Sequence, residues 1–277
     1  MKPLIIVLLI AALGVGIYLA SSEGVFDDGG GAGRHDSTDP APPPEAVAWQ
    51  VIVDAVDSRN DDLRAETLEV MADLRDSRVA KYRTRCLERD DAAIVRLRAA
   101  GLTALAGRKD LVALVKHIAA EEDDYEAYIE AARAYGRIGT PECIPELVAI
   151  LTAKDDIDSD EDSMPHAAAW LGRLGARDQI PLLRSLLDAE DEEIVFGAAC
   201  GLLLLGETDV LPRLLKGIED DSELIVPFLA WPGVDVGVPV LTATMASDEP
   251  FESERGDAAT ALATIGTDAA RAALDAA

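Results

Sequence analysis

The chain is poor in aromatic and in basic residues. Only 4% of its 277 residues are Phe, Trp or Tyr, although 49% are hydrophobic. Its apolar content is therefore mainly Ala, Leu, Val and Ile, and small aliphatic side chains suit closely packed helices. Lys and Arg number 25 against 52 Asp and Glu, so the net charge is −27. Because nucleic-acid binding depends on Lys and Arg that neutralise phosphates, we expect no nucleic-acid partner.

Groups that carry chemistry are also scarce. The three cysteines, Cys86, Cys143 and Cys200, stand far apart and form no CxxC pair. An odd number of separated cysteines argues against a disulfide framework. The sequence has no G-x-S-x-G, P-loop or H-E-x-x-H motif. We therefore predict no catalytic residue, no metal site and no cofactor, and we expect the chain not to be an enzyme.

The N-terminus, in contrast, is strongly apolar. Residues 3–22 carry no charge, and about 20 helical residues span the core of a bilayer. Lys2 precedes this segment and Glu23 follows it, so the positive-inside rule keeps the N-terminus in the cytoplasm. We predict a signal anchor over residues 1–22, which makes a single-pass protein of the bacterial cytoplasmic membrane with its repeat domain extracytoplasmic. Cleavage after the small residues 20–22 is the alternative, and it would give a secreted or periplasmic protein.

A linker is predicted between this segment and the folded part of the chain. Residues 23–45 contain three consecutive glycines at 29–31 and three consecutive prolines at 42–44. Glycine makes a chain flexible and proline extends it, so this composition is typical of a spacer. We expect it to hold the following domain away from the membrane.

The rest of the chain repeats itself at a period of about 30 residues. Six apolar stretches end in a glycine, namely Gly107, Gly139, Gly175, Gly206, Gly233 and Gly266. Four of these glycines are followed six residues later by a proline: Pro145, Pro181, Pro212 and Pro239. A leucine stands two residues after each proline: Leu147, Leu183, Leu214 and Leu241. An alanine precedes five of the glycines by seven residues: Ala100, Ala132, Ala168, Ala199 and Ala259.

Each repeated position has a physical reason. Glycine adopts the left-handed conformation that ends a helix without a Cβ penalty. Proline suits the first turn of the next helix, where its missing N–H would have no partner. The leucines lie on one face of that second helix, and the alanines allow neighbouring helices to approach closely. Each repeat is thus a helix, a glycine turn and a second helix, and stacked repeats bury apolar faces that one repeat alone leaves exposed.

This pattern resembles the HEAT-repeat family, in particular the short bacterial HEAT-like repeats of the phycobilisome-lyase type. The residues that carry the likeness are Val95-Arg96 with 98–100, 131–139, 167–175 and 198–206. Together they predict an all-α fold, an α-solenoid of helical hairpins over residues 46–277. The stretch 61–90 keeps a helical periodicity but lacks the glycine and proline marks.

One repeat carries an acidic insertion. The spacing from Gly139 to Gly175 exceeds the period, and the excess coincides with residues 155–162, six of which are Asp or Glu. Insertions in repeat proteins fall in loops on one face. Alternating aspartates are typical of the first half of a calcium loop, but the turn glycine and the closing glutamate of such a loop are missing. A solvated acidic loop, a cation site and a docking site for a basic protein all remain open.

The family resemblance also suggests where a partner binds. In HEAT-like solenoids the second helices of the repeats usually line the concave side. By that resemblance, four charged residues face a protein partner: Glu146, Arg184, Arg213 and Lys216. We predict a membrane-tethered, non-catalytic protein-interaction scaffold. The alternatives are an enzyme or enzyme-accessory protein of the bilin-lyase type, and a secreted repeat protein.

Overall fold

The computed structural model describes residues 44–74, 76–121, 125–152, 163–220, 226, 229–230, 233–246 and 252–276. Within these ranges every regular element is an α-helix or a short 3-10 helix, which confirms the predicted helical repeat fold. The chain divides into two compact units, unit 1 (Met1–Cys86) and unit 2 (Leu87–Ala277). The boundary lies within the stretch 61–90, where the sequence lacks the repeat marks.

Unit 1 contains α2 (Pro44–Val56), α3 (Asp61–Asp73) and most of α4 (Val79–Arg89). Asn60 caps α3, because its side chain accepts a hydrogen bond from the backbone N–H of Leu63. The core of the unit is small and aliphatic; its buried residues include Ile52, Val56, Ala65, Leu68, Met71 and Val79.

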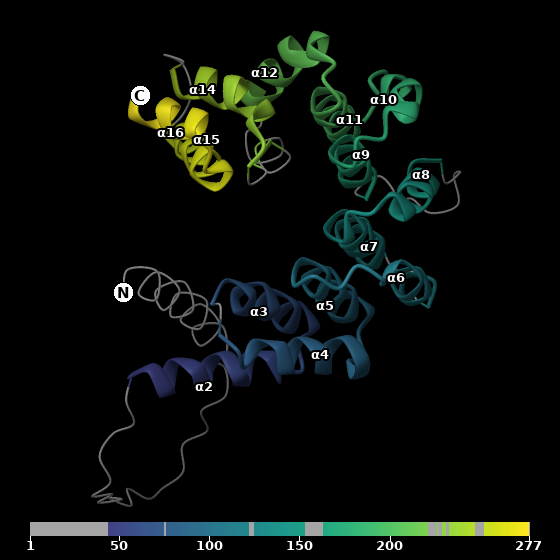
Figure 1. Cartoon of the computed structure of the whole chain (residues 1–277), viewed down its shortest axis with the longest axis vertical. Coiled ribbons are helices and arrows are strands. Elements are labelled where there is room, and N and C mark those ends of the chain that lie inside the picture. The colour runs from purple at the N-terminus through teal and green to yellow at the C-terminus, as the bar shows by residue number, and fades with distance from the viewer. Residues whose placement is uncertain are drawn as a thin grey trace, which may run out of the picture. The chain divides into compact units, whose positions relative to one another are not determined.

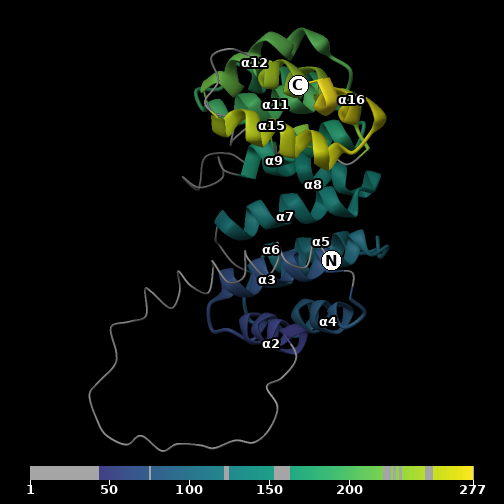
Figure 2. The same cartoon turned by 90° about the vertical axis from the view of Figure 1, so that its left-hand side faces the viewer.

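Unit 2 repeats a helix, a turn and a second helix, as predicted. The first helices are α5 (Ala93–Leu105), α7 (Tyr125–Ile138), α9 (Met164–Arg173), α11 (Glu192–Leu204) and α15 (Glu252–Ile265). The second helices are α6 (Val112–Ala119), α8 (Ile144–Thr152), α10 (Ile180–Leu186), α12 (Leu211–Asp220), α14 (Val238–Ala246) and α16 (Asp268–Ala276). Figure 1 shows α5, α7, α9 and α11 in one row and α6, α8 and α10 in a second row beside it. In the view of Figure 2, α7, α9 and α11 follow one another in the same order up the stack.

The turns between the paired helices have the predicted geometry. All six repeated glycines adopt a positive φ, from 65° at Gly266 to 107° at Gly107. Short 3-10 turns follow four of them, at η1 (Pro141–Cys143), η3 (Arg177–Gln179), η4 (Thr208–Val210) and η5 (Asp235–Gly237). Each of these turns leads into a second helix whose second residue is the repeated proline. The chain reverses at these points because glycine tolerates the left-handed turn and proline starts the next helix.

The repeated apolar positions form the core of unit 2. The leucines after the prolines, Leu147, Leu183, Leu214 and Leu241, are completely buried. The alanine column is also buried at Ala100, Ala132, Ala168 and Ala199. At α15 the register differs, since Ala258 is buried in place of the predicted Ala259, which is half-exposed. The core is therefore a column of contacts between consecutive repeats, as expected for a stack that shares its apolar faces.

The membrane localisation needs correction. Among the residues that the structure describes, no helix is long and apolar enough to cross a bilayer; the longest have 14 residues, whereas a span needs about 20. The predicted anchor over residues 1–22 and the linker up to residue 43 lie outside the described residues. The single-pass placement in a bacterial cytoplasmic membrane is contradicted on this ground, and we withdraw it.

Candidate functional site

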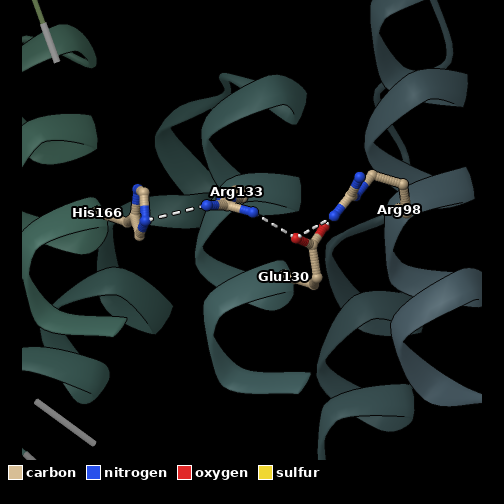
Figure 3. A network of polar contacts seen from close by, with 4 residues as sticks. All are labelled: Arg98, Glu130, Arg133 and His166. Carbon is tan, nitrogen blue, oxygen red and sulfur yellow. Dashed lines mark hydrogen bonds and ion pairs between the residues drawn. The ribbon is translucent and has the colours of Figure 1, made fainter. Parts of the chain in front are cut away.

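A chain of polar side chains runs through the buried side of three consecutive first helices. Arg98 on α5, Glu130 on α7 and His166 on α9 each stand nine residues before the turn glycine of their repeat. Because the repeats stack in register, equivalent positions of neighbouring helices face one another. Figure 3 shows the three side chains in a line, with Arg133 between Glu130 and His166.

Arg98 and Glu130 form a bidentate ion pair. Nε of Arg98 donates to Oε2 of Glu130 at 2.6 Å, and Nη2 donates to Oε1 at 2.7 Å. The exposed fraction is 6% for Arg98 and 2% for Glu130, so water has little access to the pair. Both carboxylate oxygens are therefore satisfied by one guanidinium, the geometry in which such pairs are strongest.

Arg133 adds a second cation to the same carboxylate. Its Nη1 donates to Oε1 of Glu130 at 2.7 Å, one helical turn along α7. Burial acts to raise the pKa of Glu130, but the hydrogen bonds and charges of Arg98 and Arg133 outweigh burial and lower that pKa. Glu130 is thus ionised at neutral pH, and the carboxylate is the negative centre of a group of three charges.

His166 continues the chain from Arg133 to α9. Nη2 of Arg133 lies 3.3 Å from Nε2 of His166. A guanidinium can only donate, so Nε2 is the acceptor and the imidazole is neutral with its proton on Nδ1. Burial lowers the pKa of His166 to about 4, helped by the positive charge of Arg133 and opposed by Glu130. His166 therefore stays neutral over the physiological pH range.

These four side chains link three repeats through two ion pairs and one hydrogen bond. In the part of the chain that the structure describes, no three His, Cys, Asp or Glu residues come together as the ligands of a metal ion would. Cys86, Cys143 and Cys200 are reduced and buried, and burial raises the pKa of Cys200. The thiol of Cys200 is thus protonated and poorly nucleophilic.

Sequence reasoning did not find the polar chain. The prediction rests on the repeated glycines, prolines, leucines and alanines, and it assigns no role to Glu130 or His166. A signal was nevertheless present, because Arg98, Glu130 and His166 share one position of the repeat. In α11 that position is Gly197, against which Pro165 packs so closely that a Cβ would lie 2.4 Å from the Cα of Pro165.

The four residues predicted to bind a partner all lie on second helices, and three of them connect consecutive repeats. Lys116 of α6 donates to Glu146 of α8 at 2.8 Å. Arg184 of α10 forms ion pairs with Glu207 and, at 2.9 Å, with Asp209. Arg213 of α12 donates to the backbone carbonyl of Leu187. Lys216, also on α12, is exposed.

These contacts do not test the predicted binding role. The structure brings the four residues onto one row of helices, which we call the second-helix row (α6, α8, α10 and α12). It shows that Glu146, Arg184 and Arg213 tie adjacent repeats together along this row. The acidic residues 155–162 lie outside the described residues, so the three interpretations of that insertion stay predictions.

Trp170 on α9 lies in the core of unit 2. Its exposed fraction is 9%, and its ring lies on Gly136 of α7, where a Cβ would be 1.8 Å from Cδ2 of the indole. The glycine therefore makes room for the largest side chain between α7 and α9.

Comparisons with known proteins agree with this architecture. The family model described as HEAT repeats matches residues 157–227. Comparison with curated proteins finds no match. Among solved structures, the complex of CpcE and CpcF of phycocyanin lyase from Nostoc sp. PCC7120 is similar, with a TM-score of 0.58 and 17% identity. The match covers 91% of this chain and 99% of that chain.

The likeness to the lyase complex shows a shared fold, and it also corrects one expectation. We predicted that the chain is not an enzyme because familiar catalytic motifs are missing. A chain of the same fold is part of a lyase complex, so the repeat architecture and the missing motifs do not argue against an enzyme. That prediction is contradicted, and we withdraw it.

Proposed function

We propose that the chain is a protein-binding repeat scaffold whose second-helix row contacts a protein partner. The observation that carries this proposal is the set of links along the row. Lys116 with Glu146, Arg184 with Glu207 and Asp209, and Arg213 with the Leu187 carbonyl hold charged side chains in fixed positions across repeats. Side chains that are already ordered lose less entropy when a partner binds.

The comparisons support an assembly role. The similar solved structure is a complex of two proteins, CpcE and CpcF. Stacked repeats present an extended surface because each repeat contacts only its neighbours. Glu146, Arg184, Arg213 and Lys216 are the residues of this surface that we propose for contact, with Lys216 as the exposed cation.

The experiment is affinity capture with the full chain in its native host, followed by quantitative mass spectrometry. We expect one protein to be recovered in near-stoichiometric amount with the wild type. Lys216→Glu should reduce its recovery at least tenfold, because a reversed charge in a desolvated contact costs several kcal/mol. The control is Arg59→Glu, which makes the same kind of reversal at an exposed residue of unit 1. Equal recovery with both variants, or no recovered protein, contradicts the proposal.

A second candidate function is favoured by the lyase likeness. We propose as the alternative that the chain is an enzyme or enzyme-accessory protein of the bilin-lyase type. The match covers 99% of the similar chain in the CpcE and CpcF complex, and this coverage supports the candidate. In the same capture experiment, a bait that retains a pigment absorbing visible light favours this alternative over the scaffold.

A further inference from the structure

Helix α4 has a charge opposite to that of the whole chain. The chain has a net charge of −27, yet α4 contains four basic residues and one acidic residue in the sequence VAKYRTRCLER. Arg78 stands directly before the helix and adds a further cation. A local excess of positive charge on such an acidic protein is the place where an anionic partner is attracted and not repelled.

The cations of α4 are arranged on an aromatic platform within unit 1. The guanidinium carbon of Arg78 lies 3.7 Å from the ring centroid of Trp49 on α2. Trp49 contacts Tyr82 edge to face, with 6.0 Å between the centroids. Arg85 and Lys81 lie 5.1 Å and 5.9 Å from the centroid of Tyr82. We call these five residues the α4 basic face.

Two aspartates hold the arginines of this face in place. Oδ2 of Asp76 accepts a hydrogen bond from Nη2 of Arg78 at 2.7 Å. Hydrogen bonding to Arg78 lowers the pKa of Asp76 to about 2. Asp57 pairs with one Nη of Arg85. Lys81 is exposed, and no carboxylate among the described residues pairs with it. The face thus combines two oriented guanidinium groups with an ammonium group that is available to a partner.

The spacing of these cations indicates the shape of the partner. Lys81 and Arg85 are four residues apart on α4, so they lie on one helix face with a rise of about 6 Å between them. Arg78 lies in the turn before the helix. Alternate side chains of an extended peptide are about 6.6 Å apart on the same side. Two carboxylates at alternate positions of an extended segment therefore match the spacing of Lys81 and Arg85. An apolar side chain beside them would contact Trp49, which is partly exposed.

We propose that the α4 basic face binds an extended acidic segment of another protein. A nucleic acid fits less well, because a polyanion longer than this face would meet the acidic surface of the remaining chain. A flat anionic membrane would meet it in the same way. This surface belongs to unit 1, whereas the second-helix row belongs to unit 2, so the two proposals fail or succeed separately.

The test is fluorescence anisotropy with the full chain and a labelled peptide that has glutamates at alternate positions around one leucine. We expect saturable binding that weakens as salt is raised, since exposed charges are screened. Lys81→Glu should weaken binding at least tenfold. This side chain is exposed and lies 5.9 Å from the centroid of the Tyr82 ring, so the fold should survive, which circular dichroism verifies. Arg177→Glu on η3 is the matched control, because it reverses an exposed cation in unit 2.

Specific outcomes overturn the proposal. Equal affinity of the wild type and Lys81→Glu removes the role of the face. Equal binding of a peptide with glutamine in place of glutamate removes the carboxylates from recognition. Tighter binding of a single-stranded RNA or of anionic vesicles than of the peptide, lost in Lys81→Glu, identifies a different class of partner and also contradicts it.

Discussion

Consecutive first helices of unit 2 are joined in two different ways. Between α5 and α7 the central contact is the buried ion pair of Arg98 and Glu130. Between α9 and α11 the helices meet through glycines. A Cβ on Gly172 would lie 2.2 Å from the carbonyl oxygen of Gly201, and a Cβ on Gly201 would lie 2.4 Å from that of Ala168. We call these contacts the charged seam and the glycine seam.

The two seams hold neighbouring helices together by different interactions. In the glycine seam the backbones touch, and close packing of many atom pairs supplies the attraction. In the charged seam two long side chains fill the space and must satisfy each other, because a buried charge without a partner is very costly. Stability should therefore depend on the charge of the side chains in the charged seam, and on their size in the glycine seam.

Removing the carboxylate of the charged seam should have the largest effect on stability. Glu130→Ala leaves Arg98 buried without its bidentate partner, which we expect to lower the free energy of unfolding by about 3–5 kcal/mol. The measurement is urea unfolding of the full chain, followed by circular dichroism at 222 nm. Glu192→Ala, at an exposed glutamate in the first turn of α11, is the control and should change stability by less than about 1 kcal/mol.

Replacing both partners separates charge from packing. The double variant Arg98→Leu with Glu130→Leu should recover most of the lost stability, because an apolar pair of similar volume avoids the cost of buried charge. If Glu130→Ala alone is as stable as the wild type, the ion pair does not hold the seam.

Adding a methyl group to the glycine seam should lower the free energy of unfolding by less than Glu130→Ala does. In Gly172→Ala the new methyl group meets the backbone of Gly201, which cannot rotate away, so α9 and α11 must separate. Such overpacking costs about 1–3 kcal/mol. The matched control is Gly256→Ala in α15, where a Cβ meets nothing within 4 Å and the better helix propensity should stabilise by up to about 1 kcal/mol.

The signs of these two changes are the informative result. Urea unfolding of both glycine variants should move the midpoint in opposite directions. Equal stability of Gly172→Ala and the wild type would mean that the seam is loose enough to accept a methyl group.

The comparison of the seams also shows what the sequence could predict. Turn positions such as Gly139 and Gly175 were predicted because only glycine suits a positive φ at a helix end. Buried leucines such as Leu147 followed from their regular place in the repeat. These features are local or periodic, so one chain suffices to find them.

Contacts between repeats were harder to predict. Glu130 is one of 52 acidic residues, and nothing in the sequence near it distinguishes it from the others. Only the stacking of α5 on α7 places it against Arg98. Similarly, the pairing of Arg184 with Asp209 depends on how far two side chains reach between repeats. Charged residues have long side chains whose direction the sequence does not specify. Aligning the repeats on their turn glycines would have shown that Arg98, Glu130 and His166 are equivalent.

The contact between α7 and α9, in which Arg133 donates to His166, should make the free energy of unfolding depend on pH. We expect this to be the smallest of the predicted effects. The pKa of His166 lies at about 4 in the folded chain against an ordinary value of 6.5. Between these values the unfolded chain binds a proton that the folded chain does not, so stability is fully present above about pH 6.5 and is lost as the pH falls towards 4. The half-buried ring reduces the expected loss to about 1–2 kcal/mol.

Carboxylates also titrate near pH 4, so the measurement is the difference between the wild type and His166→Gln, whose amide oxygen can still accept from Arg133. His166→Gln should show a shallower loss of stability from pH 7 to 5, and identical curves for the two proteins would mean that His166 is protonated in the fold as easily as in the unfolded chain.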